Sequence, residues 1–114
     1  MPMNIDNSKK QMRKGLLEFC ILAIISQGEI YPSDILRKLK EAKLIVVEGT
    51  LYPLLTRLKN AGLLAYNWVE STSGPPRKYF KLTDDGEVFL QELEETWNDL
   101  SHAVISATKN ITLT

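Results

Sequence analysis

The sequence predicts a mainly α-helical fold with one small β-hairpin: three helices come first, then the hairpin, then a long last helix. Apolar residues recur with a helical period before residue 62 and again after residue 84. Between these regions the period changes to two, which is typical of strands, on both sides of a turn-forming segment. At 114 residues, the chain is expected to form one main folded unit.

The first helix is predicted from an apolar run within residues 13–28, RKGLLEFCILAIISQG. Glu18 and Ser26 are the interruptions in this run, and Gly28 supplies a stop signal. A run of this length that ends at a glycine is typical of a buried helix rather than a strand. Residues 1–11 are polar and show no apolar period, so we expect them to be flexible and at most partly helical.

Cysteine content and hydropathy bear on the location of the protein. The single cysteine, Cys20, lies inside the apolar run, which excludes an intramolecular disulfide and indicates a reducing compartment. The run is too short and too interrupted to span a bilayer, and no signal peptide is visible. We therefore expect a cytoplasmic protein without a membrane partner.

The second helix is predicted within residues 31–44, YPSDILRKLKEAKL. Pro32 suits the first turn of a helix, where its missing N–H is tolerated. Ile35, Leu36 and Leu39 then form one apolar face, with basic residues outside it.

The third helix, predicted within residues 46–64 (VVEGTLYPLLTRLKNAGLL), carries its leucines on one side. Leu51, Leu54, Leu55 and Leu58 form a single stripe at the 3.6-residue period. Pro53 is expected in the first turn, and Gly62 is expected to end the helix. The opposite face carries Gly49, Thr50, Pro53, Thr56, Arg57 and Asn60, with Tyr52 and Lys59 at its edges.

A β-hairpin is predicted after the third helix. Residues 63–70, LLAYNWVE, alternate imperfectly between two faces, and residues 77–83, RKYFKLT, form a second strand-like run. Residues 71–76, STSGPP, lie between them and contain the usual turn-forming residues. We therefore expect the prolines to belong to the turn of the hairpin.

The last helix is predicted from Asp84 to Thr108, with Thr83 as its N-cap. Asp84 and Asp85 fall in the first turn, where the helix dipole favours acids. Apolar residues recur along this helix at spacings of three and four, as in a helix–helix seam. We expect a homodimer interface along this seam, formed by Phe89, Leu93, Trp97, Leu100 and Val104.

The net charge of the chain is zero, but the charges are unevenly distributed. Residues 1–60 contain ten Lys/Arg and six Asp/Glu, and residues 61–82 contain three and one. Residues 83–114 contain one Lys and seven Asp/Glu. A basic body with an acidic end points to a polyanionic partner such as nucleic acid.

Three short helices followed by a hairpin form the order of a winged helix-turn-helix, in which the third helix enters a major groove. At this level the chain resembles the PadR-like transcriptional regulators, in their short form with a single C-terminal dimerisation helix. The resemblance rests on EGTLYPLLTRLKNAGLL at residues 48–64 and SGPPRKYFKLTDDG at residues 73–86. It implies a winged helix-turn-helix DNA-binding domain at residues 1–82 and a dimerisation helix with a tail at residues 83–114.

The predicted DNA contacts lie on the third helix and the wing. Arg57 is the residue best suited to read guanine, while hydroxyl groups suit phosphates or thymine methyl groups. Tyr52 has an alternative role, packing half-buried against the second helix. The basic pair beside the wing turn is expected to contact phosphate. The full predicted set is Thr50, Tyr52, Pro53, Thr56, Arg57, Lys59, Arg77 and Lys78.

The resemblance also implies an effector site at the dimer interface. Some multidrug-sensing repressors of the family carry a tryptophan at the position of Trp97, where two such rings line a pore that stacks planar drugs. The positions that would line it here are Met12, Phe19, Trp97 and Leu100. The alternative for Trp97 is packing alone, since tryptophan is a common interface anchor.

No catalytic motif is present, and we expect neither an enzyme nor a cofactor. His102 has no second ligand at metal-binding spacing, so no metal site is expected. The sequence therefore predicts a homodimeric, sequence-specific transcriptional regulator, with repression as the expected sign and a small aromatic effector as a partner. The alternative is a winged-helix module that binds proteins and not DNA.

Overall fold

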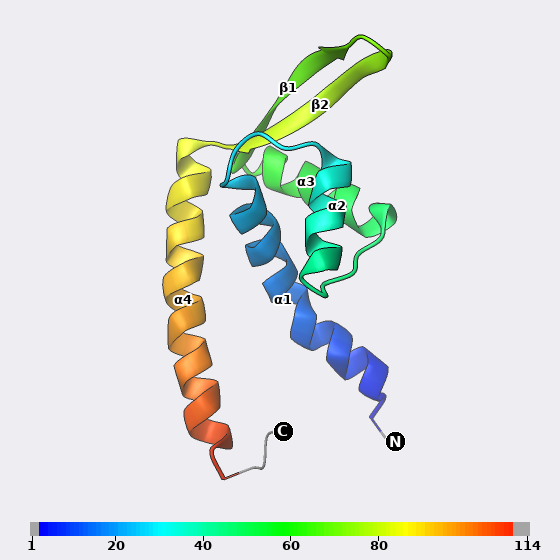
Figure 1. Cartoon of the computed structure of the whole chain (residues 1–114). Coiled ribbons are helices and arrows are strands. Elements are labelled where there is room, and N and C mark those ends of the chain that lie inside the picture. The colour runs from blue at the N-terminus through cyan, green and yellow to red at the C-terminus, as the bar shows by residue number, and fades with distance from the viewer. Residues whose placement is uncertain (1–2, 111–114) are drawn as a thin grey trace.

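The computed structural model describes residues 3–110 and arranges them as four helices and one antiparallel hairpin (Figure 1). The elements are α1 (Ile5–Ile25), α2 (Pro32–Glu41), α3 (Glu48–Asn60), β1 (Leu64–Ser71), β2 (Gly74–Leu82) and α4 (Asp84–Thr108). This order confirms the predicted winged helix-turn-helix with a long C-terminal helix. Residues 1–2 and 111–114, the end of the predicted tail, lie outside the described residues.

The core lies where the apolar faces of α1, α2 and α3 meet the base of the hairpin. As predicted, the leucine stripe of α3 faces inward: Leu51, Leu55 and Leu58 are buried, and Leu54 is half-buried. Burying one face of α3 leaves its polar face outside, which is the arrangement that a DNA-binding helix requires. The other buried core residues are Ile21, Leu22, Ile25, Ile30, Ile35, Leu39, Leu64 and Phe80.

The N-terminal segment differs from the prediction of a flexible start, because α1 is helical from Ile5 onward. Asn4 is the N-cap: its side-chain oxygen accepts hydrogen bonds from the backbone N–H groups of Asp6 (2.9 Å) and Asn7 (3.4 Å). Asp6 also places an acid in the first turn. The helix start therefore depends on polar capping, which an apolar periodicity does not reveal.

The hairpin turn is shorter than predicted. Thr72 and Ser73 form the turn, while Pro75 and Pro76 lie inside β2. Strand pairing is irregular between Val69 and Ser71, opposite these prolines. Proline lacks the N–H that a regular ladder needs, and an irregular edge pairing tolerates that loss.

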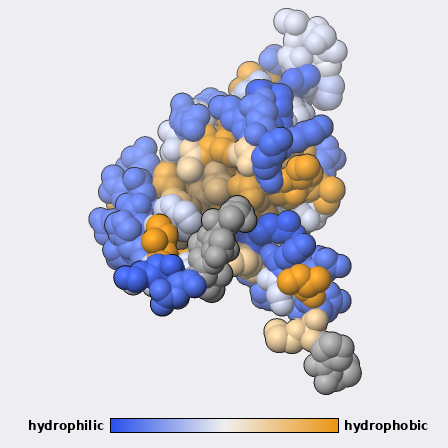
Figure 2. Space-filling model, turned by 60° about the horizontal axis from the view of Figure 1, so that its bottom comes forward, coloured by the Kyte–Doolittle hydropathy of each residue, from blue (hydrophilic) through white to orange (hydrophobic). Residues whose placement is uncertain are grey.

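Two helices project from the body of the molecule. Helices α1 and α4 contact each other and run in opposite directions, and their far ends extend away from the hairpin (Figure 1). Viewed from that end, apolar surface forms a band across the middle of the molecule between hydrophilic flanks (Figure 2). The apolar side of α4, the predicted dimerisation element, is incompletely covered, since Trp97, Leu100 and Val104 are between 42% and 57% exposed.

The N-cap residue of helix α4 is hydrogen-bonded to the chain that directly follows α3. The Thr83 hydroxyl donates to the Gly62 carbonyl oxygen (2.6 Å) and accepts from the Gly86 N–H (3.0 Å), which makes Thr83 the predicted N-cap. The Thr83 N–H donates to the Leu63 carbonyl oxygen (3.0 Å). The chain between α3 and β1, the end of β2 and the start of α4 thus meet at one point.

Candidate nucleic-acid interface

The outer face of α3 displays the predicted contact residues, because the leucine stripe on the opposite side is occupied by the core. We call this surface the recognition face; its members, all exposed, are Thr50, Tyr52, Pro53, Thr56, Arg57 and Lys59. Pro53 is the sixth residue of α3, not part of its first turn as predicted. Its missing N–H leaves the Gly49 carbonyl without the usual helical donor, on the side that faces outward.

Tyr52 lies at the edge of the recognition face and is 47% exposed. Partial burial, the Glu48 carboxylate and Tyr31 together raise the pKa of the Tyr52 hydroxyl. The shift is upward, so the phenol is protonated at neutral pH, as tyrosine ordinarily is, and its hydroxyl can donate a hydrogen bond. The exposed half of the ring and its hydroxyl are available to a ligand, while the other half fits the alternative of partial packing.

Arg57 forms an ion pair that the sequence prediction missed. Its guanidinium pairs with the carboxylate of Glu18 on α1, whose side chain is more buried than that of Arg57. In this arrangement Arg57 joins the recognition helix to α1, and it can read a base only after leaving Glu18. Glu18 interrupts the apolar run of the first helix. Because a charge among apolar residues usually has an oppositely charged partner, its position could have indicated an ion pair.

Arg77 and Lys78, the predicted basic pair of the wing, point to opposite faces of the hairpin. Arg77 pairs with Val69 and Lys78 with Trp68, so neighbouring side chains alternate between the faces. The Arg77 guanidinium lies 4.9 Å from the ring centroid of Tyr31, just before α2. Arg77 and Lys78 therefore lie on different faces of the hairpin, and their predicted phosphate contacts would be made from those two faces.

Lys78 lies on the face of the hairpin that also meets α3. Its ammonium group is 4.0 Å from the ring centroid of Tyr66, and Lys59 of α3 reaches the same ring at 5.7 Å. This places two predicted DNA-contact residues, one from the helix and one from the wing, beside a shared aromatic ring. The same face carries Trp68, which sequence reasoning did not select; its alternation with Tyr66 was the available signal.

The predicted dimer seam lies along the exposed side of α4. Phe89, Trp97, Leu100 and Val104 are between 38% and 57% exposed, while Leu93 packs partly against the core. Of the predicted effector residues, α1 carries Met12 and Phe19, and α4 carries Trp97 and Leu100. Met12 is exposed and Phe19 is half-buried. The two helices that carry these residues are neighbours within the single chain.

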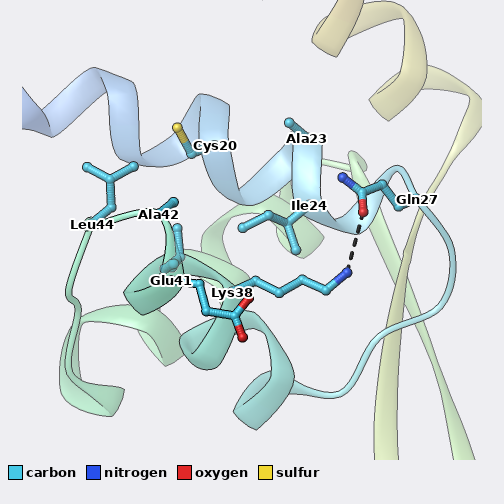
Figure 3. A pocket seen from close by; sticks show the side chains of 9 residues that line it. Cys20, Ala23, Ile24, Gln27, Lys38, Glu41, Ala42 and Leu44 are labelled. Atoms are coloured by element: carbon cyan, nitrogen blue, oxygen red, sulfur yellow. Dashed lines mark hydrogen bonds between the residues drawn. The ribbon is translucent and has the colours of Figure 1, made fainter.

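A separate hollow of about 560 Å³ lies between α1 and α2 (Figure 3). Cys20, Ile24 and Leu44 are among its lining residues, and the Lys38 ammonium at its rim donates to the Gln27 side-chain oxygen (3.4 Å). Burial raises the pKa of the Cys20 thiol, which lowers its reactivity. None of the predicted effector residues lines this hollow, so it is distinct from the predicted effector site.

Within residues 3–110, no three His, Cys, Asp or Glu side chains gather as a metal site would require. No helix there has the length and hydropathy needed to cross a membrane.

Known proteins resemble this chain over most of its length. A family model described as the transcriptional regulator PadR-like family matches residues 21–92. A solved PadR-like transcription factor from Bacteroides fragilis is 63% identical, with a TM-score of 0.76, covering 89% of this chain and 98% of that one. A PadR-like regulator from Bacillus cereus is 41% identical, with a TM-score of 0.76, covering 85% and 95%.

A further solved structure bears on the ligand. PadR from Bacillus subtilis was solved in complex with operator DNA. It is 25% identical to this chain, with a TM-score of 0.63, covering 68% of this chain and 46% of that one.

Proposed function

Because the chain belongs to the PadR-like family of transcriptional regulators, we propose that it is a sequence-specific DNA-binding repressor that acts as a homodimer. The observation that carries the DNA-binding part is the recognition face of α3 beside the cations of the wing. The likeness to a relative that was solved with operator DNA supports the same ligand. We propose repression as the sign because a bound dimer can exclude polymerase from a promoter.

The recognition face has the chemistry to contact a major groove. The hydroxyl groups of Thr50 and Thr56 suit phosphate oxygens, their methyl groups suit thymine methyl groups, and Arg57 has the fork geometry that matches guanine. Lys59, Arg77 and Lys78 supply charge toward the DNA backbone. The opposite side of α3 is buried in the core, so α3 can present one face only to a ligand.

DNA binding is tested by selecting duplexes from a random library with the wild-type protein and measuring their affinity. We expect an enriched duplex whose binding falls when Arg57→Ala and Arg77→Ala are combined. If no duplex is enriched, the proposal is wrong and the protein-binding winged-helix module becomes the better interpretation. If a duplex is enriched but the double variant binds it as tightly as the wild type, the assignment of these two arginines is wrong.

The homodimer part of the proposal rests on the seam of α4. Large apolar side chains on this helix stay exposed in the single chain, and a second copy would cover them. A two-fold dimer would carry two recognition helices to successive major grooves, about one helical turn or 10 base pairs apart. The enriched duplexes are then expected to contain an inverted repeat with that spacing.

The effector part of the proposal rests on Trp97, which is 42% exposed on the seam. Two such rings, brought together in a dimer, would offer flat apolar surfaces for a planar aromatic molecule. Titration with planar aromatic dyes, followed by Trp97 fluorescence in a Trp68→Phe background, tests this directly. We expect a bound dye to quench the emission of Trp97 and to weaken DNA binding. If the emission does not change with any of several dyes, Trp97 serves only for packing.

A further inference from the structure

The face of the hairpin that meets α3 carries a cluster of rings and ammonium groups, which we call the inner wing face: Tyr66, Trp68, Lys78 and Phe80. The ring of Trp68 stands edge-on to that of Tyr66, with centroids 6.2 Å apart. Phe80 is buried and lies 5.9 Å from Tyr66, so it anchors the cluster to the core. The cluster therefore runs from the core toward the hairpin end, with Trp68 as its outer member.

Lys78 lies at the centre of this face. Its ammonium group is 4.0 Å from the Tyr66 centroid, 5.7 Å from Trp68 and 5.8 Å from Phe80. Rings at these distances hold a cation through their electron-rich faces. The rings restrict the position of the ammonium group, and its N–H groups can still donate hydrogen bonds to an anion.

A second cation reaches the same place from α3. The Lys59 ammonium lies 5.7 Å from the Tyr66 centroid, so two like charges share one ring. Among residues 3–110, neither lysine forms an ion pair with an Asp or Glu side chain. Glu70 follows Trp68 on β1 but does not neutralise either lysine. Two gathered cations without an acid repel each other, and a bound anion would relieve that repulsion.

Trp68 is 64% exposed although tryptophan is strongly apolar. Its ring lies 5.7 Å from the Lys78 ammonium group, and it shares a hairpin face with Tyr66, the ring that Lys59 approaches. A ligand that covers this surface must therefore carry anionic groups for the lysines directly beside an apolar surface for the indole. The edge of a DNA groove offers both, since phosphates alternate there with the apolar faces of deoxyribose.

We propose that Trp68 is a further DNA-contact residue, whose indole packs against deoxyribose beside the phosphates that Lys59 and Lys78 contact. This inference rests on the proposed function and extends it to a residue that the sequence motifs did not select. It also divides the basic pair of the wing: Lys78 faces the bound backbone beside α3, whereas Arg77 is stacked on Tyr31 on the other face.

The test compares Trp68→Ala, Lys78→Gln and Lys81→Gln on a duplex selected by the wild-type protein. Lys81 is the matched control, because it is an exposed lysine on β2 that points to the opposite face. We expect Trp68→Ala and Lys78→Gln to weaken binding about tenfold, and Lys81→Gln to bind close to wild type. Trp68→Phe, which keeps a ring, should retain most of the affinity.

Salt dependence separates the two roles. Lys78→Gln should reduce the slope of log affinity against log salt by about one, because one phosphate contact is lost. Trp68→Ala should leave that slope unchanged, since an apolar contact releases no counterion. Unfolding temperatures close to wild type establish that the variants are folded.

Fluorescence gives a second measurement. The chain has two tryptophans, so Trp97→Phe leaves Trp68 as the reporter. Its emission should change on saturation with the selected duplex, and less with single-stranded DNA of the same sequence. If the Trp68→Ala and Lys78→Gln variants bind as tightly as the wild type, and the emission of Trp68 does not change on binding, this inference is wrong. The proposed function would still stand. If the wild-type protein binds no duplex, both fail.

Discussion

Arg57 has the side chain best suited to base recognition, yet in the free protein its guanidinium is engaged by Glu18 of α1. Ion pairs of exposed side chains contribute at most about 1 kcal/mol, so DNA can compete with Glu18 at moderate cost. The pair also joins the recognition helix to α1, one residue from the predicted effector residue Phe19. Arg57 can therefore pair either with Glu18 or with DNA, and a movement of α1 would shift the balance between these two partners.

Glu18→Gln is expected to strengthen duplex binding by about two- to fivefold, because it removes a carboxylate that competes for Arg57. The same substitution in an Arg57→Ala background should have no effect on affinity. Titrations of the selected duplex with the four proteins of this cycle measure the coupling. Equal effects of Glu18→Gln in both backgrounds would show that Arg57 and Glu18 do not compete in this way.

Cys20 is expected to behave as a packing residue rather than a redox sensor. Burial raises the pKa of its thiol, so the reactive thiolate forms at higher pH than in an unfolded chain. The rate of alkylation by iodoacetamide should therefore rise at higher pH in the folded protein than in the urea-unfolded protein. Faster alkylation of the folded protein near neutral pH would contradict this expectation.

At the scale of elements, the start of α4 is held against the end of α3 by close backbone packing. A Cβ atom on Gly86 would lie 2.1 Å from the Leu63 carbonyl oxygen, so only glycine fits there. The Thr83 hydroxyl bridges the same two segments through Gly62 and Gly86. Since β2 ends at Leu82, a shift of α4 must act on the base of the wing.

Gly86→Ala is therefore expected to destabilise the fold by about 2 kcal/mol, as overpacking against backbone does. Gly15→Ala is the matched control, because Gly15 lies in α1 with no atom within 4 Å of its added Cβ. Alanine in that exposed helix should raise stability by up to about 1 kcal/mol. Thermal unfolding of both variants measures the contrast, and equal stabilities would refute the close packing at Gly86.

The sequence predicted the elements better than their contacts. Helical periodicity located α3 and α4, and the hydroxyl of Thr83 marked the start of α4, because these features depend on neighbouring residues. The start of α1 was missed, since a polar Asn4 cap leaves no apolar pattern. The pairing of Arg57 with Glu18 joins residues far apart in the chain, and no local pattern contains it. The opposite orientation of Arg77 and Lys78 could have been predicted, because successive side chains of a strand point to opposite faces.

At the scale of the whole molecule, we propose that a second copy of the chain covers the exposed seam of α4. Leu100→Glu is expected to shift the protein to a monomer, because a charge would be buried in the interface without a partner. His102→Glu adds the same side chain on another side of α4 and should leave the dimer intact. Sedimentation velocity measures both. A Leu100→Glu variant that sediments with the wild type would place the interface elsewhere.

We propose that cations of α3 and of the two faces of the wing contact duplex DNA, and the salt dependence of affinity for a selected duplex tests this most directly. Lys59, Arg77 and Lys78 of two protomers would neutralise on the order of six phosphates, which predicts a log–log slope of about −5. Such a slope, reduced by the Lys78→Gln substitution and not by Lys81→Gln, is the expected result. An affinity that does not change with salt concentration would contradict the account.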